Sequence, residues 1–253
     1  MSEIDVPESH PRYQSLLTRH RIEAGVEKGI TSKQGLIAEG RGEAFDYLLG
    51  EETTPSADRA ERAAAALLLL ADRPVLSVNG NAAALVPGEM VELASVVEAD
   101  IEVNLFNRTD ERMQAIVDHL REHDAAEAGV EIKGLTADAR IPGLDHERAK
   151  VDADGIGAAD VVLVPLEDGD RAEALAEMGK REIVIDLNPL SRSAQTAAVP
   201  IIDNILRAVP NITEHARTLQ EASREELETI VREFDRERAL AAAEDAIRSG
   251  SLE

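Results

Sequence analysis

The sequence predicts an α/β protein with a mostly parallel sheet that helices cover on both faces. Four apolar runs support this prediction, and they begin at residues 74, 101, 159 and 181. None of them alternates apolar with polar residues, which is the pattern of strands that are buried on both faces. Segments of helical character separate the runs, as right-handed crossovers between parallel strands require.

The first half contains the more ambiguous elements. Residues 11–28 have nearly helical apolar spacing, and residues 32–51 predict a loop followed by a short helix. An Ala- and Leu-rich helix should extend to Ala71, with Ser56 or Asp58 as its cap. The strand at 74–80 should end in a turn. The remaining expected elements are helices at 88–97 and 109–123, a strand at 131–135 and a short helix at 146–152.

The second half is clearer. A helix at 171–178 should separate the runs at 159–170 and 181–189, and a short apolar stretch follows at 199–204. The charged segment 213–248 has heptad-like apolar spacing, which predicts a long helix or a helical pair that could pack on a second subunit. No glycine-serine linker divides the chain. We therefore expect a single domain over residues 1–253, with a flexible leader at 1–10 and a C-terminal helical extension at 213–253.

The composition excludes several classes of protein. Cysteine is absent, which rules out disulfides, thiolate metal sites and cysteine nucleophiles. The first residues lack the pattern of a signal peptide. The longest apolar run, Ala63–Ala71, is too short to cross a bilayer. These features predict a cytoplasmic protein that is not bound to a membrane.

The chain is strongly acidic, with 27 basic and 50 acidic side chains and a net charge of −23. A general nucleic-acid binder needs a positive face, so that class is disfavoured. The acidic residues are spread along the whole chain and lysine is scarce, which favours adaptation to high salt over a basic partner. Arginines beside glycines are more informative against this background.

Polar clusters follow four of the predicted strands. Ligands of open parallel sheets bind beyond the carboxyl ends of strands, so the clusters predict one crevice. Asn79 and Asn81 can bond a hydroxylated ligand, but they also suit a turn. An acidic cluster can hold Mg²⁺ or form a solvated turn. The other residues of these four polar clusters are Arg108, the acidic residues Glu167, Asp168 and Asp170, and the turn Asp186, Leu187 and Asn188.

Two arginines are the main candidates for binding an anion. Glycines flank Arg41, and Arg192 follows the strand run at 181–189, so we expect both in sharp turns. The guanidinium fork fits phosphate or carboxylate, and a surface ion pair is the alternative interpretation for each. Arg19 can point inward or lie on a solvated helix face. Lys180 can neutralise charge or simply suit the negative end of the preceding helix.

The common nucleotide-binding and hydrolase signatures are missing. The chain has no GxxxxGK[ST] phosphate loop, no GxGxxG after a strand, no HExxH and no GxSxG. Its six histidines lack metal-ligand spacing. The residues alone therefore predict an α/β protein with an anion-binding crevice, and no specific reaction.

Longer motifs resemble a known family. They are SHPRYQSLLTR (9–19), GLIAEGRGEAFDYLLGE (35–51), PVLSVNGNAAAL (74–85), EVNLFNRT (102–109), ADVVLVPLEDGDRAEAL (159–175) and IDLNPLSRSAQTA (185–197). Together they closely resemble the archaeal phosphopantothenate synthetase family, also called 4-phosphopantoate–β-alanine ligase. The resemblance covers residues 9–212, and the acidic tail after them is less distinctive.

The resemblance implies a Rossmann-like homodimer and an ATP-dependent ligase. ATP, 4-phosphopantoate and β-alanine would give 4′-phosphopantothenate, AMP and diphosphate through an acyl adenylate, on a route to coenzyme A. The family pattern implies that ATP contacts Arg19, Arg41, Asp186, Leu187, Asn188, Arg192, Ser193, Asn204 and Ile205. Arg41 and Arg192 would also stabilise charge during catalysis. For phosphopantoate or phosphate we expect Asn79, Asn81, Arg108 and Lys180, and for Mg²⁺ or the β-alanine ammonium Glu167, Asp168 and Asp170.

Three other functions compete with the ligase. A regulatory protein would bind a nucleotide without turnover. An NAD-dependent oxidoreductase would suit the parallel sheet but lacks its glycine fingerprint. A structural assembly protein would leave the crevice motifs without a role. No general base is evident in the sequence, although the β-alanine amine must lose a proton.

Overall fold

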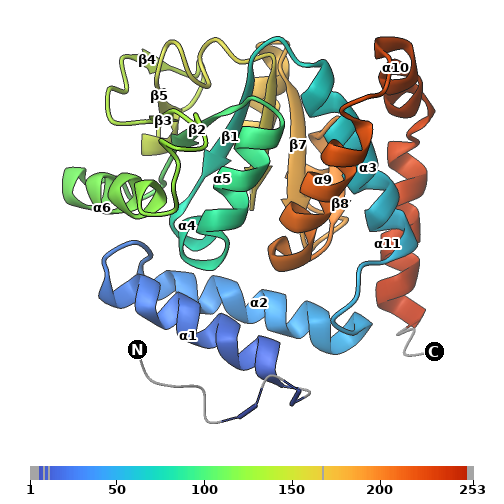
Figure 1. Cartoon of the computed structure of the whole chain (residues 1–253), viewed down its shortest axis with the longest axis horizontal. Coiled ribbons are helices and arrows are strands. Elements are labelled where there is room, and N and C mark those ends of the chain that lie inside the picture. Colours follow the sequence, from blue (N-terminus) through green and yellow to red (C-terminus); the bar gives the residue numbers. More distant parts are fainter. Residues whose placement is uncertain (1–5, 8, 11, 167, 250–253) are drawn as a thin grey trace.

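A six-stranded parallel sheet forms the centre of the computed structural model, which describes residues 6, 7, 9, 10, 12–166 and 168–249 (Figure 1). The strand order is β3–β2–β1–β6–β7–β8, which is the order of a Rossmann sheet, with its reversal between β1 and β6. The predicted α/β class is confirmed. The strands are β1 (Pro74–Val78), β2 (Asp100–Val103), β3 (Ile132–Lys133), β6 (Val161–Pro165), β7 (Arg181–Asp186) and β8 (Val199–Ile202).

Each face of the sheet is covered, which explains why its strands do not alternate. Leu76 in β1 belongs to a large core cluster on one face, and its neighbour Val75 belongs to a second cluster on the other. The first face packs against α3 (Pro55–Leu70), α5 (Pro87–Val96), α6 (Asp110–Arg121) and α9 (Ile205–Leu219). The second packs against α7 (Gly169–Glu177) and the segment with the small antiparallel pair β4 (Ala139–Arg140) and β5 (Lys150–Val151).

Two helices, α1 (Tyr13–Glu27) and α2 (Lys33–Leu49), lie side by side beyond the edge where the strands end (Figure 1). The predicted loop and tight turn around Arg41 are wrong, because α2 is one helix that includes both flanking glycines. Glycine here permits close packing. A Cβ added at Gly35 would lie 2.4 Å from Asn81 Oδ1, and one at Gly42 would lie 3.3 Å from Asn204 Nδ2.

Three other local predictions need correction. Thr54, not Ser56 or Asp58, caps α3, and its side chain accepts a hydrogen bond from the Ala57 amide at 3.2 Å. The predicted turn after β1 is the start of helix α4 (Gly80–Leu85), which the Asn79 side chain caps. The expected helix at 146–152 is only a 3₁₀ turn, η1 (Glu147–Ala149), followed by β5.

The C-terminal helices pack on the same chain. After α8 (Arg192–Thr196) and β8, helix α9 begins at Ile205, so residues 213–219 belong to this helix, and Thr213, Ala216 and Leu219 are buried. Helices α10 (Arg224–Glu233) and α11 (Arg236–Ser249) follow as a pair and lie against α3 and β8. Leu240 and Ala243 of α11 join a small cluster with Phe45. This packing covers much of the apolar stripe that the heptad-like spacing offered to a second subunit.

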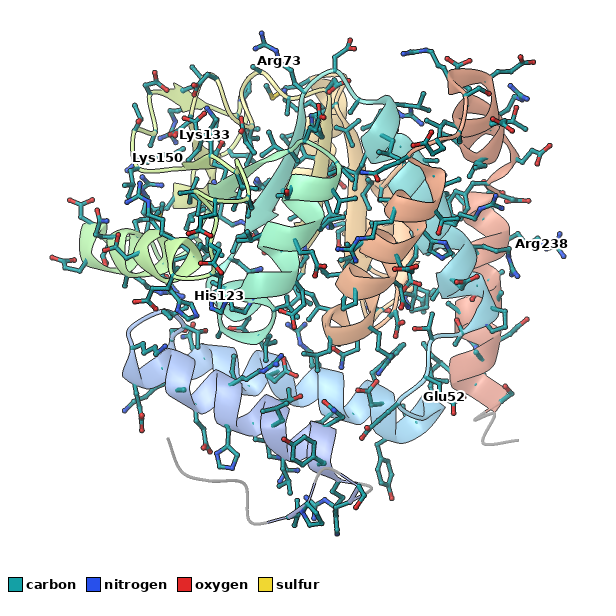
Figure 2. All side chains as sticks on the ribbon, viewed as in Figure 1. Glu52, Arg73, His123, Lys133, Lys150 and Arg238 are labelled. Atoms are coloured by element: carbon teal, nitrogen blue, oxygen red, sulfur yellow. The ribbon has the colours of Figure 1, made fainter. Side chains whose placement is uncertain are left out.

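Charged side chains surround the whole outline of the molecule, and the labelled cations Lys133 and Lys150 lie far from α1 and α2 (Figure 2). Among the described residues, no helix is both long and apolar enough to cross a membrane. Residues 1–5 and 8 of the predicted leader are outside the described residues.

Candidate active site

Three adjoining cavities form a cleft. Two of them lie between α2 and the carboxyl ends of β1, β6, β7 and β8, and the third lies between α1, α2 and the start of α9. The arginine cavity, about 420 Å³, contains Arg41 and Arg192 in its lining. The central cavity is narrow and is lined by Glu39, Asn79 and Asn204, among others. It shares Leu166 and Asp186 with the arginine cavity. The helical cavity, about 760 Å³, contains Arg19 and Arg207 and shares Glu39 and Asn204 with the central one.

The arginine cavity brings together two cations that are 151 positions apart in the chain. Arg41 extends from α2, and no carboxylate of the described residues lies within ion-pair distance of it. Arg192 opens α8 and has an exposed partner, Glu173, at 3.5 Å, which is a weak ion pair in water. A Cβ at Gly169 would lie 2.7 Å from the Arg192 Cβ, so only glycine leaves room for this arginine. The guanidinium groups are thus available to an anionic ligand.

Asp186, at the end of β7, builds the loop that carries Arg192. Its Oδ1 accepts hydrogen bonds from the Leu187 and Asn188 amides at 2.7 and 3.1 Å. Its Oδ2 accepts from the Ser191 and Ser193 hydroxyls at 2.6 and 3.2 Å. The carboxylate that we expected to contact ATP is therefore occupied within its own loop. It holds the loop in shape and still lines two cavities of the cleft.

The other expected ATP contacts are divided among the cavities. Asn188 and Ser193 line the arginine cavity, and Leu187 and Ile205 line the central cavity. Asn204 caps α9 through its Oδ1 and donates through Nδ2 to Asp46 at 2.9 Å. The structure thus brings the predicted nucleotide residues to one cleft. Arg19 lies at its far end in the helical cavity, which Asn204 also lines.

Two of the predicted magnesium ligands, Asp168 and Asp170, have basic side chains as partners. Arg148 Nη1 donates to Asp168 at 2.7 Å, and His146 Nε2 lies 3.2 Å from Asp170. Arg148 is almost fully buried and also donates to Asn104 Oδ1 at 3.1 Å. Glu167 lies outside the described residues. The sequence did not point to Arg148, since it follows neither a strand nor a glycine.

Asn79 and Asn81 serve mainly to hold the fold together. Asn79 donates to the Pro165 carbonyl at 2.9 Å, which joins the ends of β1 and β6, and its Oδ1 caps α4. Asn81 is buried, accepts from Thr31 and donates to the Gly35 carbonyl at 3.0 Å. Both line the central cavity, but their polar side-chain atoms already have partners. Their bonds are structural, but they hold the start of a helix in place and not the turn that the sequence suggested as the alternative.

Arg108 and Lys180 do not line the cleft. Arg108 donates to the Gly134 carbonyl at 2.6 Å, beside the edge strand β3. Lys180 lies just before the first residue of β7, at the amino edge of the sheet, and donates to the Gly157 and Ala159 carbonyls at 3.0 and 2.8 Å. Because all six strands are parallel, that edge is opposite the cleft. We therefore remove Lys180 from the candidate substrate residues, whereas Arg108, which follows the carboxyl end of β2, lies outside the lining of the three cavities.

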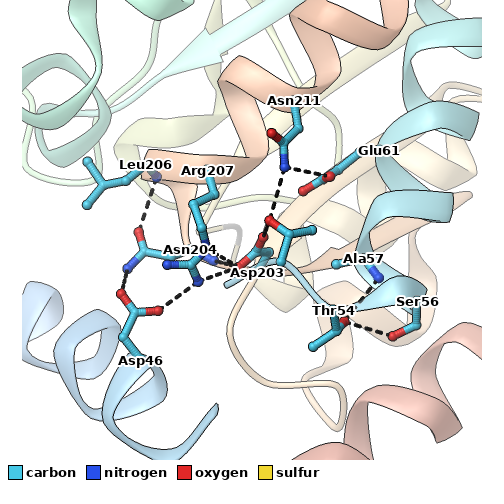
Figure 3. A network of polar contacts seen from close by, with 11 residues as sticks. Asp46, Thr54, Ser56, Ala57, Glu61, Asp203, Asn204, Leu206, Arg207 and Asn211 are labelled. Atoms are coloured by element: carbon cyan, nitrogen blue, oxygen red, sulfur yellow. Dashed lines mark hydrogen bonds and ion pairs between the residues drawn. The ribbon is translucent and has the colours of Figure 1, made fainter. Parts of the chain in front are cut away.

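The helical cavity contains arginines of a different kind. Arg19 donates to both carboxylate oxygens of Glu43, at 2.5 and 3.0 Å. Arg207 lies between Asp46 and Asp203, at 2.7 and 2.6 Å (Figure 3). These cations stabilise the contact between α1, α2 and α9, and they differ from the arginines of the first cavity in having close carboxylate partners.

Glu39 is a cleft residue that the sequence gave no reason to select. Burial, and then the charges of Asp46 and Glu43, raise the pKa of Glu39 to about 7. Its Oε1 is buried and has no hydrogen-bond partner among the described residues. A carboxyl group in this state at a ligand cleft can bind a cation or exchange a proton near neutral pH.

Helix α4 does not have the phosphate-binding start of a dinucleotide enzyme. In such enzymes the first strand leads into a helix whose free amides hold the diphosphate. Here the Asn79 side chain occupies the amides of Asn81 and Ala82. A Cβ at Gly80 would lie 2.6 Å from the Ile30 carbonyl, so the α1–α2 loop covers this position. The geometry disfavours the oxidoreductase alternative.

The comparisons with known proteins decide the family. The family model described as phosphopantothenate/pantothenate synthetase matches residues 56–250. The chain belongs to the phosphopantothenate/pantothenate synthetase family. The predicted resemblance is confirmed.

Several curated relatives of this synthetase family are similar over most of their length. A 4-phosphopantoate–beta-alanine ligase of Thermococcus kodakarensis is 57% identical over 238 residues, which are 94% of this chain and 90% of the relative. The proteins of that name from Methanosarcina mazei and Methanospirillum hungatei are 54% and 55% identical. These two alignments cover 94% and 90% of this chain and 92% and 90% of the relatives.

Proposed function

We propose that this chain is an ATP-dependent ligase that condenses 4-phosphopantoate with β-alanine to form 4′-phosphopantothenate, AMP and diphosphate. One observation carries the proposal beyond the family: Arg41 and Arg192 share a cavity in a chain with a net charge of −23. Two of the three reactants are strongly anionic. The negative charge of the protein repels these reactants. Cations without strong carboxylate partners are therefore needed to bind them.

In the first step, the carboxylate of 4-phosphopantoate attacks the α-phosphorus of ATP. A bond from the carboxylate oxygen to phosphorus forms, and the bond to the bridging oxygen breaks, so that diphosphate leaves with the electron pair. Arg41 and Arg192 would hold the phosphates and stabilise the charge that develops on the leaving group. Asp186 would act as a positioning residue, since it fixes the loop of Arg192.

In the second step, the amine of β-alanine attacks the acyl carbon of the adenylate and AMP leaves. The nucleotide must stay in place between the two steps, which favours an extended site. Our proposed ATP contacts are the residues of the arginine and central cavities, Arg41, Asp186, Leu187, Asn188, Arg192, Ser193, Asn204 and Ile205, with Arg19 at the end of the cleft.

Magnesium would enter with the nucleotide. ATP-dependent enzymes commonly hold Mg²⁺ with one or two carboxylates and the substrate phosphates. Asp168 and Asp170 line the arginine cavity, but their pairing with Arg148 and His146 makes them poor ligands as they stand. The proposed roles of the protein residues do not depend on a protein-bound metal.

The surface of the chain is consistent with a homodimer in a cytoplasm of high salt concentration. Four of the large exposed apolar residues lie on α2, and they are Leu36, Ile37, Tyr47 and Leu48. An exposed apolar stripe of this kind is typical of an interface between protein chains. The same helix carries Arg41, so a partner subunit would lie close to the cleft. The high negative charge would remain compatible with folding where salt screens repulsion.

The decisive test is product formation by the purified full-length chain. We expect AMP to form from ATP only when 4-phosphopantoate and β-alanine are both present, with one 4′-phosphopantothenate for each AMP. Mixtures lacking one substrate are the controls. ATP binding without this turnover would instead support the regulatory alternative. Molecular mass in solution, measured over a range of salt concentrations, tests the dimer.

A further inference from the structure

Three carboxylates lie along one side of α2 at the cleft. Glu39, Glu43 and Asp46 are separated by four and three residues, the spacing that aligns side chains on one helix face. All three line the helical cavity. They differ in what each carboxylate meets across the cavity, and Glu39 alone of the three also lines the central cavity.

Two of these carboxylates have a cation from another helix. Glu43 accepts two hydrogen bonds from Arg19 of α1. Asp46 accepts from Arg207 of α9 at 2.7 Å and from Asn204 at 2.9 Å. In the described part of the chain, Glu39 has no such cation. A buried carboxylate without a partner is unfavourable, so an additional cation would stabilise this position.

Glu39 also occupies the junction of the cleft. It is one of the two residues that line both the central and the helical cavities. A Cβ at Gly42 would lie 3.0 Å from Glu39 Oε1, so glycine one turn along the helix leaves room for the carboxylate to fold back. The Glu39 side chain therefore lies where the helical cavity meets the central cavity.

We propose that the Glu39 carboxylate binds the ammonium group of β-alanine and accepts its proton before the amine attacks. This inference rests on the proposed ligase function and assigns the subsite of the amine substrate. One proton passes from nitrogen to Glu39, the freed lone pair forms the bond to the acyl carbon, and AMP leaves with the electrons of the broken carbon–oxygen bond. The second proton leaves the nitrogen for water when the amide forms.

The raised pKa of Glu39 is consistent with this role, because a base with a pKa near the working pH exchanges protons efficiently. Arginines neutralise the neighbouring carboxylates Glu43 and Asp46, so these two are less suited to bind the ammonium group and accept its proton. An ammonium ion is the right ligand for this position because it supplies both the positive charge and the hydrogen-bond donors that Oε1 lacks.

The test separates the two half-reactions in Glu39→Gln. Exchange of radioactive diphosphate into ATP, which needs 4-phosphopantoate but not β-alanine, should stay within about twofold of the wild type. The kcat/KM for β-alanine should fall by about 100-fold. Hydroxylamine, which is mostly uncharged at neutral pH, should still trap the adenylate at nearly the wild-type rate. Glu51→Gln is the matched control, because Glu51 lines the same cavity and is exposed.

Each other outcome has a distinct meaning. If Glu39→Gln slows diphosphate exchange and raises the KM for ATP, the carboxyl group contacts the nucleotide and the inference is overturned. An unchanged kcat/KM for β-alanine overturns it as well. If the wild-type chain shows no exchange that depends on 4-phosphopantoate, the proposed function fails before the subsite is tested. Glu39→Asp, which keeps the charge, should retain more β-alanine activity than Glu39→Gln.

Discussion

The two ends of the cleft contain the same kinds of side chains in opposite states of pairing. At one end Arg41 has no close carboxylate among the described residues, and Arg192 has only an exposed one at 3.5 Å. At the other end, Arg207 and Arg19 each contact a carboxylate within 2.7 Å. Both ends contribute arginines to a cavity, yet only the first offers guanidinium groups that an anion can bind without displacing a carboxylate.

This difference shows that pairing is a better guide to binding than residue type. An arginine between two carboxylates has its charge neutralised and its donors used, so it holds helices together. An arginine with free donors in the same field attracts phosphate. Glu39 is the reverse case, since it is the unpaired anion at the end where the cations are paired. The following predictions test this contrast, beginning with the largest effect.

Arg41→Ala should cause the largest loss of activity. We expect kcat/KM for ATP to fall by about 10²–10³-fold, as for removal of one donor to a developing charge, with the free energy of unfolding almost unchanged. Steady-state kinetics and denaturant titration would measure both. Arg224→Ala is a control, because Arg224 is an exposed residue of α10 and lines none of the three cavities. Wild-type turnover in Arg41→Ala would contradict the role of the arginine cavity.

Arg207→Ala should act mainly on stability. It leaves Asp46 and the buried Asp203 without their shared cation, and breaking such a pair typically costs about 3 kcal/mol. Denaturant unfolding at constant salt concentration would measure this loss. Arg217→Ala, which removes a more exposed ion pair with Glu92, is the matched control. If the free energy of unfolding falls no more than in that control, Arg207 does not hold the helices around the helical cavity together.

Glu61→Gln should change how stability depends on pH. Burial, and then the charge of Asp203, raise the pKa of Glu61 to about 8, although Asn211 donates to it at 3.0 Å (Figure 3). The folded state therefore keeps a proton that the unfolded chain releases near pH 4.5. This contribution to stability is complete below pH 4.5 and is lost as pH rises to about 8.

The neutral amide cannot release a proton, so Glu61→Gln should show a flatter stability profile between these pH values. At pH 8 and above it should be more stable than the wild type by a few kcal/mol. Thermal unfolding at a series of pH values would measure the difference. Glu228→Gln, at an exposed position of α10, should leave the profile unchanged. Parallel profiles for wild type and Glu61→Gln would contradict burial of the charged form as the cause.

Arg19→Ala should have the smallest effect. Its ion pair with Glu43 is partly exposed, and such pairs contribute about 0–1 kcal/mol to stability. We expect kcat/KM for ATP to fall by no more than about tenfold, a change of about 1.4 kcal/mol. If the loss equals that of Arg41→Ala, the Glu43 pair must open when ATP binds. The contrast between the two ends of the cleft would then fail.

The sequence was sufficient for the sheet and for the rough position of the cleft. Apolar runs without alternation identify the buried strands, and polar residues after β7 and β8 do line the cleft. The glycines around Arg41 were misread as a turn, although both lie within α2. Gly42 leaves room for Asn204, whereas a side chain at Gly40 would meet only open space. Lys180 was misplaced although the sequence could have excluded it, because a residue that precedes the strand run at 181–189 must lie at the amino edge of a parallel sheet, opposite the cleft.

By itself the sequence determined the α/β class, the family and the residue types that the chemistry needs, because these depend on local pattern and on long shared motifs. Only the tertiary structure decided which charges are neutralised. Arg148 and Asp168, or Arg207 and Asp46, are neighbours only after folding. Electrostatic interaction depends on distance and burial, not on separation along the chain. For this reason Glu39, an ordinary glutamate in the sequence, becomes the unpaired carboxylate of the folded cleft.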